Sequence, residues 1–480
     1  MIGLIGIVLS LALLIVFAYR GVNVIILAPL MALLATVFAG GVPLLATYTQ
    51  VFMPALGGYV ITYFPLFLLG AIFGKLMDDS GSARAIAYFI VDKLGGSRAI
   101  LAVVLACAVL TYGGVSLFVV AFAVFPIAAA MFREAGVPKR LIPASIALGS
   151  FTFTMTALPG TPQIQNAIPA PFFGTDAFAA PGLGIIAALI MFGGGTWWLS
   201  HRSKKLQAAG EGYLDAGDTA KAEKAAAAAG GTATKVEAGT AATDTRPRPS
   251  ALLAFLPIVV VIAVNLLLVR LVFPAMNTSY LAEDAYGATD LETVGGIWAI
   301  VVALVVACLL VIALNWTRLA DLRASLNEGS FASFLPIFNT ASEVGYGAVI
   351  AALPAFRIVR DAVLGISNNP VVSLAVSVNV LAGITGSASG GMSIALQALG
   401  EQFRGLAEDQ GISLELMHRV TVLAAGGFDA LPHNGAVITV LAICGLTHRQ
   451  SYKDIFVVAV AIPVVALVTV IALGTAFGGF

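Results

Sequence analysis

The stretch Gly426–Ala436 reads Gly-Gly-Phe-Asp-Ala-Leu-Pro-His-Asn-Gly-Ala and lies in the middle of apolar sequence that runs from Val420 to Leu446. A plain membrane-spanning helix would not contain these residues, because glycine and proline weaken a helix and free backbone groups that then need partners. A carboxylate, an imidazole and an amide are also costly at membrane depth, where such groups usually face a cavity or a partner. The stretch therefore predicts a broken helix whose unwound middle lines a solute site.

Composition is typical of a polytopic membrane protein. Of the 480 residues, 59% are hydrophobic, only 10% are charged and 50 are glycine. At roughly 20 residues per crossing, this length predicts an all-α membrane protein with about 10–14 transmembrane segments. The net charge is zero, so nucleic acid is not expected as a partner. The first apolar run, Ile2–Tyr19, lacks a basic leader and a cleavage motif, and we expect it to be a retained helix.

A polar segment divides the chain. Residues 203–250 are rich in Ala, Gly, Thr and charge, a composition that predicts a flexible linker. Trp197 and Trp198 precede it and are followed by a basic cluster, which places this side in the cytoplasm. We therefore expect an N-terminal transmembrane repeat over 1–202, a cytoplasmic linker over 203–250 and a C-terminal transmembrane repeat over 251–480.

Other long apolar segments are interrupted in the same way. Residues 99–132 contain Gly113–Ser116 at their centre and are too long for one straight helix, so a re-entrant hairpin or a broken helix is expected. Residues 141–173 carry two prolines, a glycine and several hydroxyl and amide side chains. Residues 370–403 are predicted to break within Gly383–Ser393.

The interruptions follow the same order in both halves. The Gly-Gly-Val-Ser of 113–116 resembles the Gly-Gly-Met-Ser of 390–393, and both halves then carry Ala-Leu-Pro, at 157–159 and at 430–432. Matching Gly/Pro interruptions in two halves indicate a midplane binding site between structural repeats. Inverted topology of these repeats is inferred from transporter architecture.

Hydrogen-bond donors at the interruptions suit a carboxylate substrate. Broken helices offer free N–H groups at a positive dipole end, and glycine lets the substrate approach the backbone closely. Two alternatives stay open: Gly and Ser serve helix packing, and the amides and Thr161 cap freed helix ends. The predicted substrate-binding residues are Gly114, Ser116, Thr161, Gln163, Asn166, Ser389, Gly390, Gly391, Ser393 and Asn434.

Three residues are candidates for proton coupling. His433 carries an imidazole that changes charge near neutral pH, Asp429 precedes it by one helical turn, and Glu343 is the other intramembrane acid. The alternatives are that Asp429 binds a loop N–H and that Glu343 faces a polar joint. Sodium is the competing coupling ion, because oxygens around Gly386–Gly390 suit a hard cation.

No enzyme is predicted. The chain has neither a Gly-x-Ser-x-Gly elbow nor a metal-ligand helix, so no catalytic residue, metal or cofactor is expected. Cys107, Cys308 and Cys444 are isolated in apolar runs and are expected to be buried apolar residues. A membrane-embedded enzyme and a channel are the alternatives to a transporter.

The layout, the Gly-Gly-x-Ser motifs and the Leu-Pro-centred breaks resemble the gluconate:proton symporter (GntP) family of the ion-transporter superfamily. The resemblance covers nearly the whole chain outside 203–250, and Phe428–Thr439 resembles most the members described as 3-hydroxybutyrate permeases. It implies a secondary active transporter that imports a small hydroxycarboxylate, first of all 3-hydroxybutyrate, by proton symport with alternating access. It also implies a multi-pass homodimer in the lipid bilayer of the bacterial inner (cell) membrane. Gluconate or another sugar acid, or sodium-coupled carboxylate transport, is the alternative.

Overall fold

The computed structural model describes residues 2–20, 22–95, 98–213, 249–432 and 434–480. All regular elements in these residues are helices, which confirms the predicted all-α class. The first half of the chain forms α1 (Ile2–Tyr19), α2 (Val24–Ala39), α3 (Leu44–Thr47), α4 (Met53–Asp79), α5 (Ser82–Leu94), α6 (Ala99–Tyr112), α7 (Leu117–Glu134), α8 (Ile142–Ser150), α9 (Phe153–Thr156), α10 (Ile164–Ala167), α11 (Ala170–Phe173) and α12 (Pro181–Ala208).

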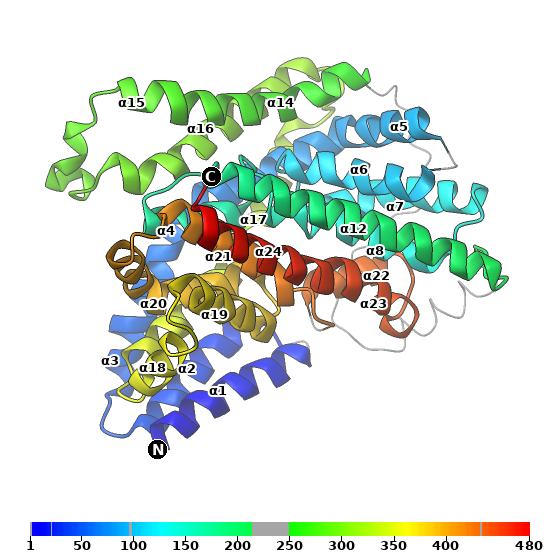
Figure 1. The fold of residues 1–480 in the computed structure, drawn as a ribbon. Coiled ribbons are helices and arrows are strands. Elements are labelled where there is room, and N and C mark those ends of the chain that lie inside the picture. The colour runs from blue at the N-terminus through cyan, green and yellow to red at the C-terminus, as the bar shows by residue number, and fades with distance from the viewer. Residues whose placement is uncertain (1, 21, 96–97, 214–248, 433) are drawn as a thin grey trace.

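The second half is packed against the first along its length. It forms α14 (Ala251–Leu267), α15 (Phe273–Ala275), α16 (Leu291–Leu314), α17 (Leu322–Ala352), α18 (Phe356–Leu364), α19 (Pro370–Thr385), α20 (Ala388–Asp409), α21 (Leu414–Phe428), α22 (Gly435–Ile443), α23 (His448–Phe456) and α24 (Ile462–Phe477). Helix α17 packs along α4 and α2. Helix α24 packs along α12, as the red and green helices at the centre of Figure 1 show. The α14–α16 pair and the α1–α2 pair lie at opposite ends of the molecule.

The outer surface carries many large apolar side chains. Leu45, Ile61 and Leu252 are 81%, 81% and 82% exposed, respectively. Apolar exposure on this scale fits contact with lipid rather than water. Within the described residues, five helical stretches are long and apolar enough to cross a membrane: Leu44–Asp79, Pro181–Ala208, Ala251–Ala275, Leu291–Leu314 and His448–Phe477.

These findings support a polytopic membrane protein. Four shorter apolar helices accompany the five stretches, and α6 and α19 are two of them because a break ends each one early. The total of about 10–14 transmembrane segments stays a prediction. So does the division into three parts: α12 continues to Ala208, and residues 214–248 of the expected linker lie outside the described residues.

The break expected at 113–116 is confirmed. Helix α6 ends at Tyr112, and α7 begins after Ser116, which is its N-cap residue. Gly114 has a φ of +94°, in the left-handed region that glycine adopts without strain. A Cβ at Gly114 would also lie 2.9 Å from Pro162 Cγ, so this glycine lets the two interrupted segments of the first half approach each other.

The break expected within 383–393 is also confirmed, but its turn differs from the predicted one. Gly386 has a φ of +64° and ends α19, and the Ser387 hydroxyl then accepts a bond of 3.0 Å from the Gly390 N–H at the start of α20. The pairing of 113–116 with 390–393 as two turns is therefore wrong. Gly390–Ser393 lie inside α20, because the left-handed glycine and the serine cap come before them.

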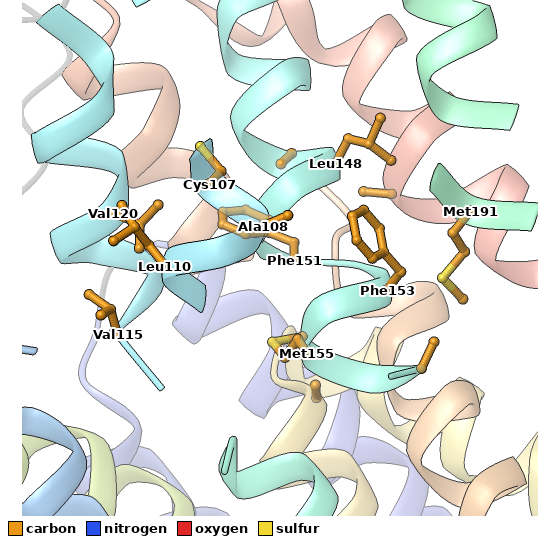
Figure 2. Close-up of a cluster of buried hydrophobic side chains, with 14 of the residues drawn as sticks. Cys107, Ala108, Leu110, Val115, Val120, Leu148, Phe151, Phe153, Met155 and Met191 are labelled. Atoms are coloured by element: carbon orange, nitrogen blue, oxygen red, sulfur yellow. The ribbon is translucent and has the colours of Figure 1, made fainter. Parts of the chain in front are cut away.

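The two Ala-Leu-Pro motifs lie where predicted, in unwound segments. Residues 157–163 separate α9 from α10, and 429–434 separate α21 from α22. His433 of the second segment lies outside the described residues. Figure 2 shows the apolar packing at the first segment, where Phe153 of α9 lies beside Met191 of α12. The rings of Phe153 and Phe192 are 5.6 Å apart, so α12 covers the short helices before the unwound segment.

Candidate functional site

A cavity of about 320 Å³ lies between α4, α11, α17 and α20. Its apolar wall includes Ile168, Phe172 and Val344, and its polar wall consists of Tyr59, Thr62, Tyr63, Ser393 and Gln397. The described part of the chain contributes no Lys, Arg or His to this lining. A mostly apolar cavity with a few hydroxyl and amide groups is the usual form of a small-molecule site.

Three buried oxygen atoms at this place have no hydrogen-bond partner in the described residues. They are the Tyr59 hydroxyl of α4, the Ser393 hydroxyl of α20 and Glu343 Oε2 of α17. The three residues are only 6%, 4% and 3% exposed. Buried polar atoms are normally bonded, so a group of open ones beside a cavity indicates a place for a ligand.

Glu343 lies against the first turn of α20. A Cβ at Gly390 would overlap the Glu343 carboxylate and would lie 2.9 Å from Ser387 Oγ. The position therefore has to be glycine for the acid to reach the helix end, where the partial positive charge of the dipole faces it. The surrounding helices leave Glu343 only 3% exposed, so its carboxyl group has little contact with solvent.

The neighbouring predicted residues of α20 have different surroundings. A Cβ at Gly391 would overlap the backbone of Ala382, so Gly391 permits close packing of α19 on α20. The Ser389 hydroxyl lies 3.5 Å from Thr340 Oγ1 and 3.5 Å from Ser387 Oγ. Gly391 thus matches the packing alternative, while the Ser389 hydroxyl lies between the hydroxyls of Thr340 and Ser387.

The second-half unwound segment is held by side chains. Asn434 Nδ2 donates to the Gly386 carbonyl at 2.9 Å, and its Oδ1 accepts from the Val437 N–H at 2.9 Å. Tyr452 donates to the Ala430 carbonyl at 3.1 Å. These bonds supply partners for backbone groups that the break leaves free. Asp429 is also buried here, and its Oδ1 has no partner within the residues described.

The first-half unwound segment is held in the same way. Gln163 Nε2 donates to the Thr111 carbonyl at 2.8 Å, and Asn166 Nδ2 donates to the Ala177 carbonyl at 2.8 Å and to the Thr161 carbonyl at 3.2 Å. Thr161 Oγ1 is buried, and none of the described residues bonds it. These contacts match the capping alternative for the two amides. Their role toward a substrate stays a prediction.

The structure therefore does not bring all the predicted site residues together. Ser393 lines the cavity, Gly390 lies beside Glu343, and Ser389 lies beside Thr340 of the same helix as Glu343. The remaining predicted residues lie elsewhere: Gly114 and Ser116 at the first-half turn, Gly391 inside α20 against α19, and Thr161, Gln163, Asn166, Asp429 and Asn434 in or next to the two unwound segments. Tyr59 and Gln397 were not predicted, because both lie on uninterrupted helices and no local motif marks them.

Arg419 was also missed, since beside His418 it resembles a residue at a membrane boundary. Both side chains are 0% exposed. The guanidinium donates to the Ala179 carbonyl at 2.7 and 3.0 Å and to Asn166 Oδ1 at 3.3 Å. His418 Nδ1 lies 2.6 Å from Thr175 Oγ1. Arg419 therefore joins α21 of the second half to the loop that precedes α12.

Comparison with known proteins supports a transporter. No protein-family model matches the chain. The chain is 46% identical, over 477 residues, to "Uncharacterized transporter YxjC" of Bacillus subtilis (strain 168), and the match covers 98% of each protein. The name of this relative agrees with the long apolar helices described above. Because this identity extends over nearly the full length of both proteins, the chain belongs to the same transporter family as YxjC.

Proposed function

We propose that this protein is a secondary active transporter of the gluconate:proton symporter type that imports a small hydroxycarboxylate, 3-hydroxybutyrate in the first place, together with a proton. The observation that carries the proposal is Glu343. It is a buried acid with an oxygen that no described residue bonds, and it lies beside a cavity between helices. Ionisable groups inside a membrane protein commonly mark an ion or proton pathway.

The lining of the cavity favours a short acid over a sugar acid. Most of the wall is apolar, and the polar groups are three hydroxyl side chains of α4, the Ser393 hydroxyl and the Gln397 amide. A sugar acid would bring several hydroxyl groups against apolar side chains, and each unpaired hydroxyl lowers affinity. A four-carbon hydroxy acid needs partners for one carboxylate and one hydroxyl.

Two matching features support alternating access between two repeats. In each half a helical pair turns at a left-handed glycine, Gly114 or Gly386. In each half an amide side chain at the end of the unwound segment also holds the helical pair. Gln163 donates to the Thr111 carbonyl at the carboxyl end of α6, and Asn434 donates to the Gly386 carbonyl at the carboxyl end of α19. Equivalent interrupted elements are the usual frame of a rocking transporter. Inverted topology, a homodimer and an inner-membrane location are part of this proposal.

The test is uptake by purified protein in liposomes with an inward proton gradient and sodium-free buffer. Labelled 3-hydroxybutyrate should accumulate, a proton uncoupler should abolish the accumulation, and lactate should compete better than gluconate. Accumulation of gluconate alone would replace the substrate class. Dependence on added sodium in place of the proton gradient would replace the coupling ion, and passive equilibration without accumulation would point to a channel.

A further inference from the structure

The open hydroxyls of Tyr59 and Ser393 line one cavity, and Glu343, whose carboxyl group also has an open oxygen, directly precedes Val344 of the same lining. We propose that Tyr59 and Ser393 hold the substrate carboxylate and that Glu343 completes this site only when it carries a proton. One proton would then enter with each carboxylate. This inference rests on the proposed function and adds the groups that recognise and couple the substrate.

The two hydroxyls are fixed in place as donors. The rings of Tyr59 and Tyr63 are 4.6 Å apart, and Tyr63 is itself anchored because its hydroxyl donates to the Ile168 carbonyl at 3.2 Å. Ser393 follows Gly390 by three residues on α20, so the two lie on one face of that helix. Tyr59 and Ser393 both line the cavity, one from α4 and the other from α20. The site therefore has two rigid neutral donors and one acid.

The charges around Glu343 make the proton necessary. On α4 the titratable groups that face this region are Tyr59 and Tyr63, which are neutral donors. Helix α2 has no ionisable residue, and the charged residues of α20 lie beyond its first three turns, from Glu401 onward. No described positive side chain thus offsets the charge of a bound carboxylate. Two carboxylates at one site repel each other strongly unless they share a proton.

Protonation turns Glu343 from an acceptor into a donor. A neutral carboxyl group can donate its O–H to the substrate carboxylate, next to the donors of Tyr59 and Ser393. The first turn of α20 then faces a pair that carries one negative charge, and the helix dipole stabilises that charge. Release of the substrate removes the acceptor of that proton, so the proton can leave in the same half of the cycle. Substrate binding and proton binding are therefore coupled through the contact between the Glu343 carboxyl group and the substrate carboxylate.

The first experiment measures proton uptake on binding. At a pH at which Glu343 is ionised in the substrate-free protein, wild-type protein in weakly buffered detergent solution should take up about one proton per 3-hydroxybutyrate bound. Under the same conditions Glu343→Gln should take up none while still binding. In liposomes, Glu343→Gln should lose gradient-driven accumulation and retain exchange of labelled for unlabelled substrate. Proton uptake by Glu343→Gln equal to that of the wild type would overturn the role of Glu343. That result leaves the proposed symport standing, because wild-type uptake tests it separately.

The second experiment removes the hydroxyl donors. Tyr59→Phe and Ser393→Ala should each raise the KM of exchange by roughly tenfold, since each removes one bond to a charged group. Tyr346→Phe is the matched control, because the Tyr346 hydroxyl is also buried on a membrane helix but lies 3.0 Å from Ser10 Oγ, toward α1. An unchanged KM in Tyr59→Phe would sink the assignment. Thermal unfolding of each variant with and without 3-hydroxybutyrate separates lost binding from lost folding.

Discussion

Gly390→Ala tests the link between Glu343 and α20. The backbone of Gly390 is ordinary helix, so alanine fits the local conformation and gains up to about 1 kcal/mol of helix propensity. Its Cβ, however, would overlap the Glu343 carboxylate. Overpacking in a filled interior costs about 1–3 kcal/mol. The two effects leave a loss of roughly 0–3 kcal/mol in the free energy of unfolding, less than the total stability of a typical folded protein.

Transport should suffer much more than stability. The carboxyl group of Glu343 has to leave the helix end, and a misplacement of about 1 Å in a coupling group can cost around 100-fold in rate. Proton-driven uptake in liposomes should therefore fall by about that factor, while the unfolding temperature in detergent changes little. The assay compares initial uptake rates at equal amounts of reconstituted protein.

Gly405→Ala is the control for this experiment. Gly405 lies on the same helix, and a Cβ there would meet no atom within 4 Å among the described residues. It should raise stability slightly and leave uptake unchanged. Adding Glu343→Ala to Gly390→Ala should restore the lost stability without restoring accumulation, with a coupling energy of about 1–3 kcal/mol. Wild-type uptake by Gly390→Ala would refute the reasoning.

Three further predictions concern other parts of the molecule. Gln397→Leu should reduce the preference for 3-hydroxybutyrate over butyrate by roughly tenfold in competition assays. Gln397 lines the cavity one turn beyond Ser393, where its amide can bond the substrate hydroxyl, so an unchanged preference would contradict this role. Arg419→Ala should destabilise the protein, seen as a low yield of monodisperse protein, because each buried oxygen that loses its donor costs about 1–3 kcal/mol. Asp290 lies before the span that begins at Leu291, and its pKa is lowered, first of all by the hydrogen bond from the Thr293 N–H. Its stabilising effect is complete above the pKa of an unfolded aspartate and is lost as pH falls through the lower folded value, so Asp290→Asn should flatten the acid limb of the unfolding temperature.

The amino-acid sequence alone determined the membrane class and the places where helices break. Both are local properties of the chain. A run of apolar residues requires lipid or a protein interior, whatever it packs against. A left-handed glycine such as Gly114 or Gly386 ends a helix through its own backbone, and Ser387 after Gly386 caps the next helix. The unwound segments at 157–163 and 429–434 were predictable for the same reason.

The tertiary structure decided which of the chemically active residues meet. The sequence offers Asp429, His433 and Glu343 on equal terms, and only the packing of α17 against α4 and α20 brings Glu343 beside a cavity. Tyr59 joins that site from a helix without any interruption, so no local pattern could have marked it. The sequence predicted Gly390 as part of a turn. In the fold it lies within α20, and its missing side chain leaves room for the Glu343 carboxylate of α17. A cavity depends on distances between distant segments, which the periodicity and the residue types of one segment do not contain.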